Sequence, residues 1–267
     1  MRRIDLHMHT SRSDGRFPAD EVLSRCVAGR LDFVALTDHD LPPTLAPGPR
    51  TVGEQSIHLI AGAEVSGVHA GSEFHLLVYF PADVPEEFSA LCKRQVAARV
   101  DRYEAAAEAL GLTAEIAPEA RSGQLALTRH HLARALVESG RATDMRDAFT
   151  RFVGDHSGTV APMPLPFTEA IQTARECGGV TSWAHPPRAA VEAHVETFAH
   201  AGLQGLEGLR PKLDSSDRRF YRRICERSGL FLTAGSDWHG WHDPDLGLFF
   251  GEPVELRGFL TALEAAA

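Results

Sequence analysis

Two histidines near the start of the chain are spaced for binding a metal ion. His7 and His9 lie in a run that alternates apolar and polar residues, as a β-strand does, so both imidazoles point to one face. Asp14 follows in a Ser-Asp-Gly turn, close enough to reach back to them. Taken alone, the His-x-His pair is equally compatible with a surface strand that carries two solvated histidines.

Residues of the same kinds recur in later strand-like runs. They are His39, Glu64, His75, His185, Asp237 and His239. In a barrel of alternating strands and helices, the carboxyl ends of the strands share the face that holds the active site. Imidazole mixed with carboxylate suits Zn²⁺, Mn²⁺ or Fe²⁺ better than Ca²⁺ or Mg²⁺. These residues are more than the four ligands that one tetrahedral ion needs, so we expect several ions and a carboxylate that bridges two of them. Such ions activate water and hold phosphate oxygens.

Composition and charge restrict the classes of function. The 267 residues, 43% of them apolar, suit one catalytic domain or a domain with an insertion. The net charge of −9 argues against a general electrostatic grip on long duplex nucleic acid. The four scattered cysteines form no CxxC motif, so we expect reduced, mostly buried thiols in a cytoplasmic protein. We expect neither a signal peptide nor a membrane partner, because no apolar run approaches the length that spans a bilayer.

The predicted elements alternate as in an α/β protein. Strands are expected at residues 3–9, 33–36, 58–65, 74–80, 180–184, 203–207 and 230–234. Helices are expected at residues 18–29, 167–177, 191–201, 215–228 and 256–264. The run 74–80 follows its neighbour through a Gly-containing turn, which favours an antiparallel pair. Residues 41–56 are rich in Pro and Gly, so we expect an exposed loop there.

Residues 86–160 interrupt this alternation with helical patterns. Helices are expected over 86–110, from Arg129 to about Gly140, and over 144–152. The first of them carries a charged face that we expect to be solvated; it consists of Lys93, Arg94, Arg99 and Arg102. The chain thus divides into a barrel of residues 1–85 and 161–267 and a helical insertion of residues 86–160 that caps the substrate site.

The ordered set of motifs resembles the PHP (polymerase and histidinol phosphatase) family of metal-dependent phosphoesterases. The matching segments are Asp5-Leu6-His7-Met8-His9-Thr10, Ser13-Asp14-Gly15, Thr37-Asp38-His39-Asp40, Gly62-Ala63-Glu64-Val65-Ser66, Phe74-His75-Leu76-Leu77, Ala184-His185-Pro186 and Gly235-Ser236-Asp237-Trp238-His239. The resemblance implies an α/β fold, a distorted (β/α)₇ barrel, with about three divalent ions (Mn, Fe or Zn). It implies one ion on His7, His9, Glu64 and Asp237, a second on Glu64, His75 and His185, and a third on Asp14, His39 and His239.

Within that family, the insertion is similar to that of small phosphoesterases that act on nucleotides. These members hydrolyse the 3′-phosphate of nucleoside 3′,5′-bisphosphates, trim the 5′ ends of short RNAs, or open cyclic nucleotide phosphates. Their insertion usually carries Arg-Pro-His-Ile-Ala, where this chain has Arg129-His130-His131-Leu132-Ala133. We therefore expect Arg129 and His131 to contact a substrate phosphate; a helix-start arginine and a packed histidine are the alternative. Arg210 and Lys212 could serve a second phosphate or form a plain basic loop.

The implied function is hydrolysis of a phosphate ester of a small nucleotide or short oligonucleotide by a metal-activated hydroxide. The expected catalytic residues among the ligands are Asp14, His39, Glu64 and His239. A cyclic nucleotide phosphodiesterase is one alternative, and a non-catalytic metal- or nucleotide-binding domain is another. Because all nine ligand positions are filled, we expect an enzyme.

Overall fold

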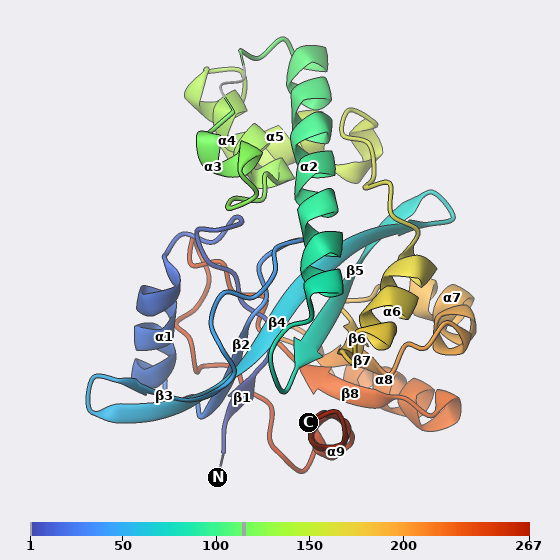
Figure 1. Ribbon diagram of the computed structural model, residues 1–267. Coiled ribbons are helices and arrows are strands. Elements are labelled where there is room, and N and C mark those ends of the chain that lie inside the picture. The colour runs from blue at the N-terminus through green and yellow to red at the C-terminus, as the bar shows by residue number, and fades with distance from the viewer. Residues whose placement is uncertain (1, 114–115) are drawn as a thin grey trace.

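The strands form one curved sheet that closes into a barrel. A computed structural model describes residues 2–113 and 116–267 (Figure 1). The sheet runs in the order β1 (Ile4–Asp5), β2 (Phe33–Leu36), β4 (Gln55–His69), β5 (Ser72–Phe80), β6 (Val180–Trp183), β7 (Gly205–Leu209) and β8 (Phe231–Ala234). It closes where the Leu6 N–H donates to the Ala234 carbonyl at 3.0 Å and Met8 bridges to Trp238. The predicted distorted barrel is confirmed.

β5 is the strand that distorts the barrel. It runs antiparallel to β4, as the turn before it predicted, and also antiparallel to β6. The other neighbours, β1 with β2, β2 with β4, β6 with β7 and β7 with β8, are parallel. In consequence the first residues of β5 lie beside the last residues of β4, with His75 opposite Ser66. This explains why His75 lies near the start of its strand.

Two predictions about strands are wrong. The segment 41–56 is not all loop, because Gly48–Val52 forms β3, an antiparallel edge strand that turns into β4. Proline is tolerated in such a strand because one side lacks a partner, and Gly53 supplies the φ of +60° for the tight turn. The expected strand 3–9 is regular only over Ile4–Asp5, because the residues after it make isolated contacts with the end of β8 instead of a continuous ladder.

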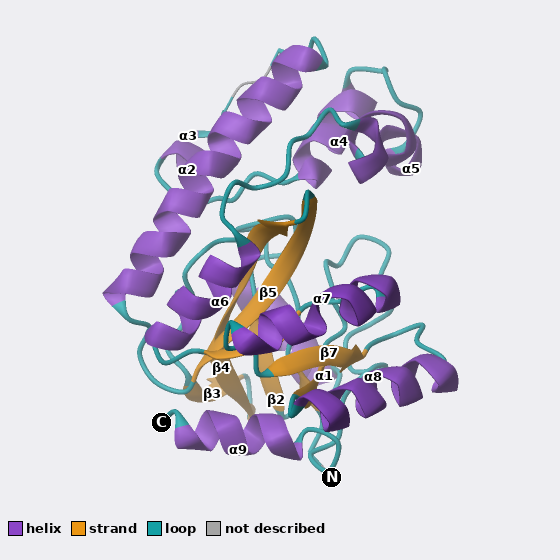
Figure 2. Cartoon of the chain, turned by 90° about the vertical axis from the view of Figure 1, so that its right-hand side faces the viewer, coloured by secondary structure: helices purple, strands orange, loops and turns teal. Residues whose placement is uncertain are grey.

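Amphipathic helices cover the outside of the barrel (Figure 2). They are α1 (Ala19–Ala28), α6 (Phe167–Glu176), α7 (Arg188–His200), α8 (Ser215–Ser228) and α9 (Arg257–Ala265). Local sequence explains the ends of α8, since Asp214 accepts bonds from the first-turn N–H groups and Gly229 adopts a φ of +66°. On α6, Phe167 and Ile171 join the buried core that Trp183 of β6 shares. The helices expected outside the insertion are confirmed.

Residues 86–160, called the cap below, stand over one end of the barrel (Figure 1). They comprise α2 (Glu86–Ala109), α3 (Pro118–Arg121), α4 (Arg129–Glu138), α5 (Met145–Ala148), a π-helical turn η1 (Phe149–Val153) and a 3₁₀ turn η2 (Asp155–Ser157). The start of α2 packs into the barrel core through Phe88 and Leu91. Its end packs in the cap core with Leu132 and Leu136 of α4. α2 therefore contributes to both cores and fixes the cap on the barrel.

The prediction of a solvated charged face on α2 is wrong for two of its arginines. Arg99 is 2% exposed, and its Nε lies 2.6 Å from Asp40 Oδ2. Arg102 NH1 lies 2.7 Å from Glu73 Oε2. Lys93 and Arg94 are exposed, as expected. A charge remains buried only beside a countercharge, and these two acids come from distant parts of the chain.

The described residues bear on two further expectations. No helix among them is long and apolar enough to cross a membrane. All four cysteines are free thiols, and Cys26, Cys92 and Cys225 are buried, as predicted. Burial raises the pKa of the Cys225 thiol to about 12, so this sulfur stays protonated and unreactive.

Candidate metal centre

All nine predicted ligands converge at one end of the barrel. Their nitrogen and oxygen atoms form four overlapping groups, in each of which the atoms lie within 4.8 Å of one another. The groups are His9, Asp14, His39 and His239; His7, Glu64 and His185; His7, His9 and Asp237; and His39, Glu64 and His75. His185 and Asp237, just after β6 and β8, have positive φ angles of 30° and 55°. Such angles are uncommon outside glycine and cluster at functional sites.

The atoms expected around the first ion lie close to one another. His7 Nε2 lies 3.2 Å from His9 Nε2, 3.4 Å from Glu64 Oε2 and 3.3 Å from Asp237 Oδ1. His9 Nε2 lies 3.3 Å from each of the same two oxygens. An ion about 2.0–2.1 Å from four tetrahedral ligands places neighbouring ligand atoms about 3.3–3.4 Å apart. These distances therefore fit a small divalent cation.

Glu64 presents one oxygen to each of two groups. Its Oε2 faces His7 and His9, while its Oε1 lies 3.0 Å from His75 Nδ1 and 2.9 Å from His185 Nε2. Glu64 Oε2 lies 2.9 Å from His39 Nδ1, yet neither buried atom has a hydrogen-bond partner among the described residues. Buried polar atoms without partners call for an explanation. A bound cation would supply one here, held by Glu64 and the histidines around it.

The group around Asp14 is looser. Asp14 Oδ1 lies 3.3 Å from His239 Nε2, and Oδ2 lies 3.6 Å from His39 Nε2. His9 Nδ1 is 3.8 Å from Asp14 Oδ1. A neutral imidazole has a single lone pair, so His9 can ligate either this ion or the first, where its Nε2 already fits. Asp14, His39 and His239 are then the residues of this group that could ligate a further ion.

The histidines and carboxylates of the cluster shift one another's pKa. Burial opposes ionisation of Glu64, but His39 and the other nearby histidines hold its pKa well below the usual range. Burial also opposes the charge on His75 and His239, yet Glu64 and Asp14 respectively raise the pKa of each to about 10. Metal ligation requires neutral imidazoles, so the binding of divalent cations should release protons and weaken as the pH falls.

Glu207 is part of the site and was missed by sequence reasoning. It is fully buried in β7, where its Oε1 accepts a hydrogen bond from His7 Nδ1 at 2.8 Å and its Oε2 accepts one from the His185 N–H at 2.6 Å. The first bond fixes the tautomer of His7 and leaves the Nε2 lone pair free for a metal. Gly235 makes room, because a Cβ there would overlap Glu207 Oε1. The available signal was a carboxylate at the end of the strand predicted over residues 203–207.

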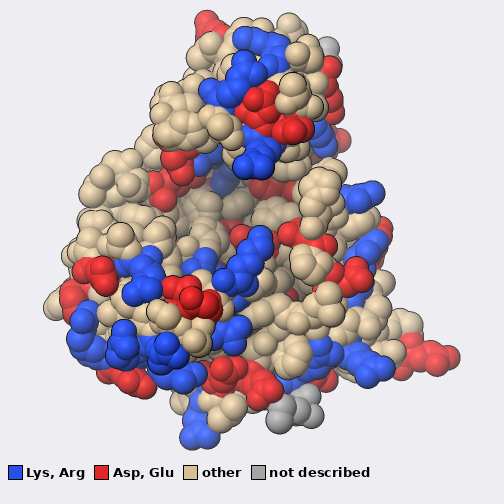
Figure 3. All heavy atoms as spheres, turned by 180° about the vertical axis from the view of Figure 1, so that it is seen from behind, with Lys and Arg blue, Asp and Glu red and all other residues tan. Residues whose placement is uncertain are grey.

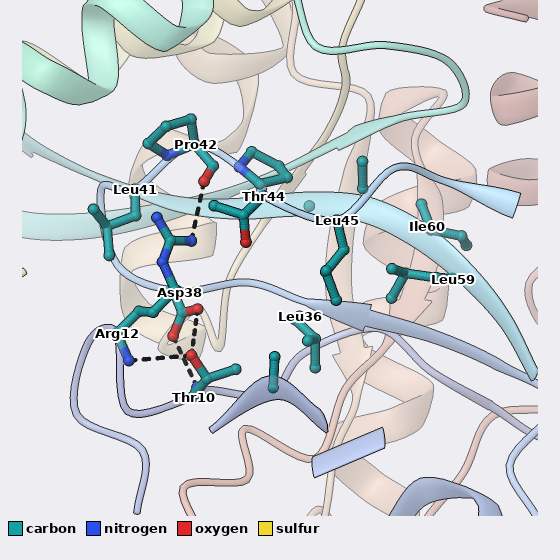
Figure 4. A pocket seen from close by; sticks show the side chains of 14 residues that line it. Thr10, Arg12, Leu36, Asp38, Leu41, Pro42, Thr44, Leu45, Leu59 and Ile60 are labelled. Carbon is teal, nitrogen blue, oxygen red and sulfur yellow. Dashed lines mark hydrogen bonds between the residues drawn. The ribbon is translucent and has the colours of Figure 1, made fainter. Parts of the chain in front are cut away.

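Asp38 holds the loop that leads to Asp14 (Figure 4). Its carboxylate accepts hydrogen bonds from the Thr10 N–H at 2.8 Å and the Thr10 hydroxyl at 2.7 Å. Arg12 NH1, in the same loop, donates to the Pro42 carbonyl at 3.2 Å. The Pro-rich segment, whose role the sequence left open, is thereby tied to the loop.

Asp40 joins the motif of His39 to the cap. It has a φ of +51°, and its buried carboxylate accepts a hydrogen bond from Arg99 Nε at 2.6 Å. Arg99 NH1 also donates to the Leu127 carbonyl at 3.0 Å. One buried guanidinium therefore links the residue after His39 to the segment that leads into Arg129.

A cavity of about 680 Å³ lies between the metal centre and the cap, and the surface between cap and barrel is hollowed (Figure 3). Asp14, His39 and His239 line it from the barrel, and Arg129 lines it from α4. Arg129 NH1 pairs with the exposed Asp155 at 2.5 Å. The candidate metal ligands and the guanidinium of Arg129 therefore face the same open cavity.

The other two predicted substrate contacts lie outside the cavity lining. His131 Nδ1 accepts a hydrogen bond from the Thr128 N–H at 3.1 Å and completes the capping box of α4. Arg210 NH2 donates to the Tyr221 hydroxyl at 3.2 Å. Contact of either residue with substrate stays a prediction. His130, which the sequence gave no role, lines the cavity.

No protein-family model matches the chain, but curated relatives do. The chain is 30% identical over 251 residues to the 5′-3′ exoribonuclease Rnm of Escherichia coli (strain K12), covering 88% of this chain and 84% of that protein. It is 29% identical over 278 residues to the 3′,5′-nucleoside bisphosphate phosphatase of Chromobacterium violaceum, covering 99% and 98%. Both names describe hydrolysis of phosphate esters.

Two solved structures match the chain over nearly its whole length. An amidohydrolase from Chromobacterium violaceum, solved with bound sulfate and no metal, superposes with a TM-score of 0.78 at 26% identity, covering 99% of this chain and 96% of the other. A protein from Bifidobacterium adolescentis assigned as a metal-dependent phosphoesterase superposes with the same TM-score and identity, covering 98% and 96%.

Proposed function

The chain belongs to the PHP family of metal-dependent phosphoesterases, and from that premise we propose that it hydrolyses a phosphate ester of a small nucleotide. The 3′-phosphate of a nucleoside 3′,5′-bisphosphate and the 5′ end of a short oligoribonucleotide are the substrate classes that its relatives' names suggest. One observation carries the proposal: the candidate ligands and Arg129 face the same cavity, whose volume of about 680 Å³ suits a ligand of this size.

We propose that the nine ligands hold about three divalent ions, of Mn, Fe or Zn, with Glu64 between two of them. The spacing around His7 and His9 and the two-sided position of Glu64 support this arrangement. Bound there, such ions supply an activated water and neutralise charge on the phosphate oxygens.

The chain's own residues bind and orient the substrate in this proposal. The planar guanidinium of Arg129 can hold a phosphate through two hydrogen bonds. The phosphate would replace the exposed Asp155 carboxylate, which now pairs with Arg129. Glu73 lies beside both Arg129 and Arg102. Burial opposes its ionisation, but His75 and these arginines hold the pKa of Glu73 well below the usual range, so it stays charged and keeps both guanidinium groups in place.

Among the expected catalytic residues, Asp14, His39 and His239 line the cavity and would meet the scissile phosphate first. Glu64 lies behind them, fully buried. The cap covers this end of the barrel and would limit the access of bulk water to the reacting phosphate. In these roles Arg129 holds a remote phosphate and so orients the one that is cleaved.

A substrate screen with metal-loaded protein tests the proposal. Adenosine 3′,5′-bisphosphate, a cyclic nucleotide phosphate and short 5′-phosphorylated RNAs would be compared by release of phosphate or mononucleotide. We expect turnover of the first or third class, and loss of it in Asp14→Asn, whose side chain lies outside the apolar cores. Turnover of the cyclic phosphate alone would favour the diesterase alternative. Full metal content without turnover of any substrate would point to a non-catalytic binding domain.

A further inference from the structure

One wall of the cavity is apolar, although its floor is a cluster of charged ligands. Val137 of α4, Met145 of α5 and Phe149 of η1 belong to the same lining as Asp14 and His239. Most ligand sites combine such apolar walls with a few polar groups that set the orientation. A substrate for this cavity therefore carries a phosphate at one end and an apolar surface at the other.

Phe149 is the conspicuous member of this wall. It is 37% exposed, whereas its neighbours Ala148 and Val153 are fully buried. It is also the first residue of the π-helical turn η1, and π-helical turns are rare and often occur at functional sites. A large aromatic ring left open inside a catalytic cavity is placed to contact a ligand.

Two aromatic rings connect this wall to the metal centre. His130 stacks on Trp241 with ring centroids 5.0 Å apart and an interplanar angle of 29°. Trp241 Nε1 in turn donates a hydrogen bond to the Asp14 carbonyl at 2.7 Å. From His130 the cavity-facing side of α4 continues to Val137, about 10 Å further along the helix. With distance from the metal ligands, the lining thus changes from this aromatic pair to apolar side chains, with the charged Arg134 and Glu138 of α4 among them.

We propose that the base of the nucleotide substrate binds this strip, which consists of His130, Val137, Met145, Phe149 and Trp241, with Phe149 as its stacking platform. The proposal rests on the proposed function and adds the part of the substrate that lies away from the phosphate. Stacking on an aromatic side chain tolerates any base, because every base has a π-face. The strip therefore holds purine and pyrimidine nucleotides alike, in keeping with an enzyme that reads phosphates rather than base edges.

Calorimetric binding to metal-loaded protein tests this site directly. Adenosine 5′-monophosphate and ribose 5-phosphate share the phosphate and sugar, and only the first has a base. We expect wild type to bind the nucleotide about 5- to 150-fold more tightly, the factor that stacking of one base supplies. Phe149→Ala should lose most of this preference and keep its affinity for ribose 5-phosphate, whereas Phe149→Trp should retain the preference.

Leu248→Ala is the matched control, since Leu248 is 75% exposed and outside the cavity lining. Equal affinity of wild type for the two compounds, or an equal loss for both in Phe149→Ala, would overturn the base site. Hydrolysis is measured separately. A wild type that prefers the nucleotide but hydrolyses none would refute the proposed function and leave the base site standing.

Discussion

Replacing Glu207 by Gln tests whether a buried carboxylate outside the ligand set controls metal affinity. Glu207 accepts two hydrogen bonds, from His7 Nδ1 at 2.8 Å and from the His185 N–H at 2.6 Å. Gln has the same size but one acceptor end and one donor end. It can therefore satisfy only one of the two donors.

Both arrangements of the amide weaken the site. If the amide oxygen keeps His7, the buried N–H of His185 loses its partner, at a cost of about 1–3 kcal/mol. If it keeps His185, the amide NH₂ faces His7 Nδ1 and favours the tautomer that protonates Nε2, the atom that faces His9 and Asp237. Loss of such a supporting partner typically lowers metal affinity 10- to 100-fold, which corresponds to about 1.4–2.7 kcal/mol.

Competition with a chelator measures this affinity in wild type and Glu207→Gln. The stabilisation that excess metal gives against thermal unfolding should shrink by a similar free energy, because it depends on the logarithm of the dissociation constant. Glu226→Gln, on the exposed surface of α8, removes the same charge and should behave as wild type. Wild-type metal affinity in Glu207→Gln would refute the role assigned to this carboxylate.

Three further experiments test residues in and around the site. Glu64→Gln should reduce the metal content, measured by elemental analysis, more than His185→Gln does, because the two oxygens of Glu64 face different groups of ligands. Full metal occupancy in Glu64→Gln would contradict the proposal that Glu64 bridges two ions. Arg129→Ala should raise the KM for a nucleotide with a second phosphate about 10- to 150-fold, because it removes a charge-assisted hydrogen bond worth roughly 1.5–3 kcal/mol. The KM for an aryl phosphate should hardly change. Equal losses on both substrates would count against phosphate recognition by Arg129. Arg99→Met should lower the free energy of unfolding by about 3–5 kcal/mol, since it leaves the buried carboxylate of Asp40 without its countercharge. A urea titration that shows no loss of stability would contradict this role of Arg99.

The sequence determined the barrel and the residues that could hold metal. Strand and helix periods act over a few neighbouring residues, so they are readable from the chain alone. Because parallel strands place their carboxyl ends at one face, the residues after them were expected to gather at one end of the barrel, as His39, His185 and Asp237 do within the overlapping groups. His75 joins them from β5, which runs antiparallel to β4, and the Gly-containing turn before β5 had indicated this antiparallel pairing.

Only the tertiary structure decided how these ligands are supported and what lies above them. The partner of His7 is Glu207, 200 residues away, and no local pattern encodes that pairing. The sequence predicted Arg99 to be a solvated surface residue, whereas in the structure it is buried beside Asp40. The Arg-His-His motif likewise could not show which histidine turns toward the cavity, because a capping bond at the start of α4 holds His131 back. Local sequence specifies an element and its faces, whereas the partner of a buried polar group depends on how distant elements pack together.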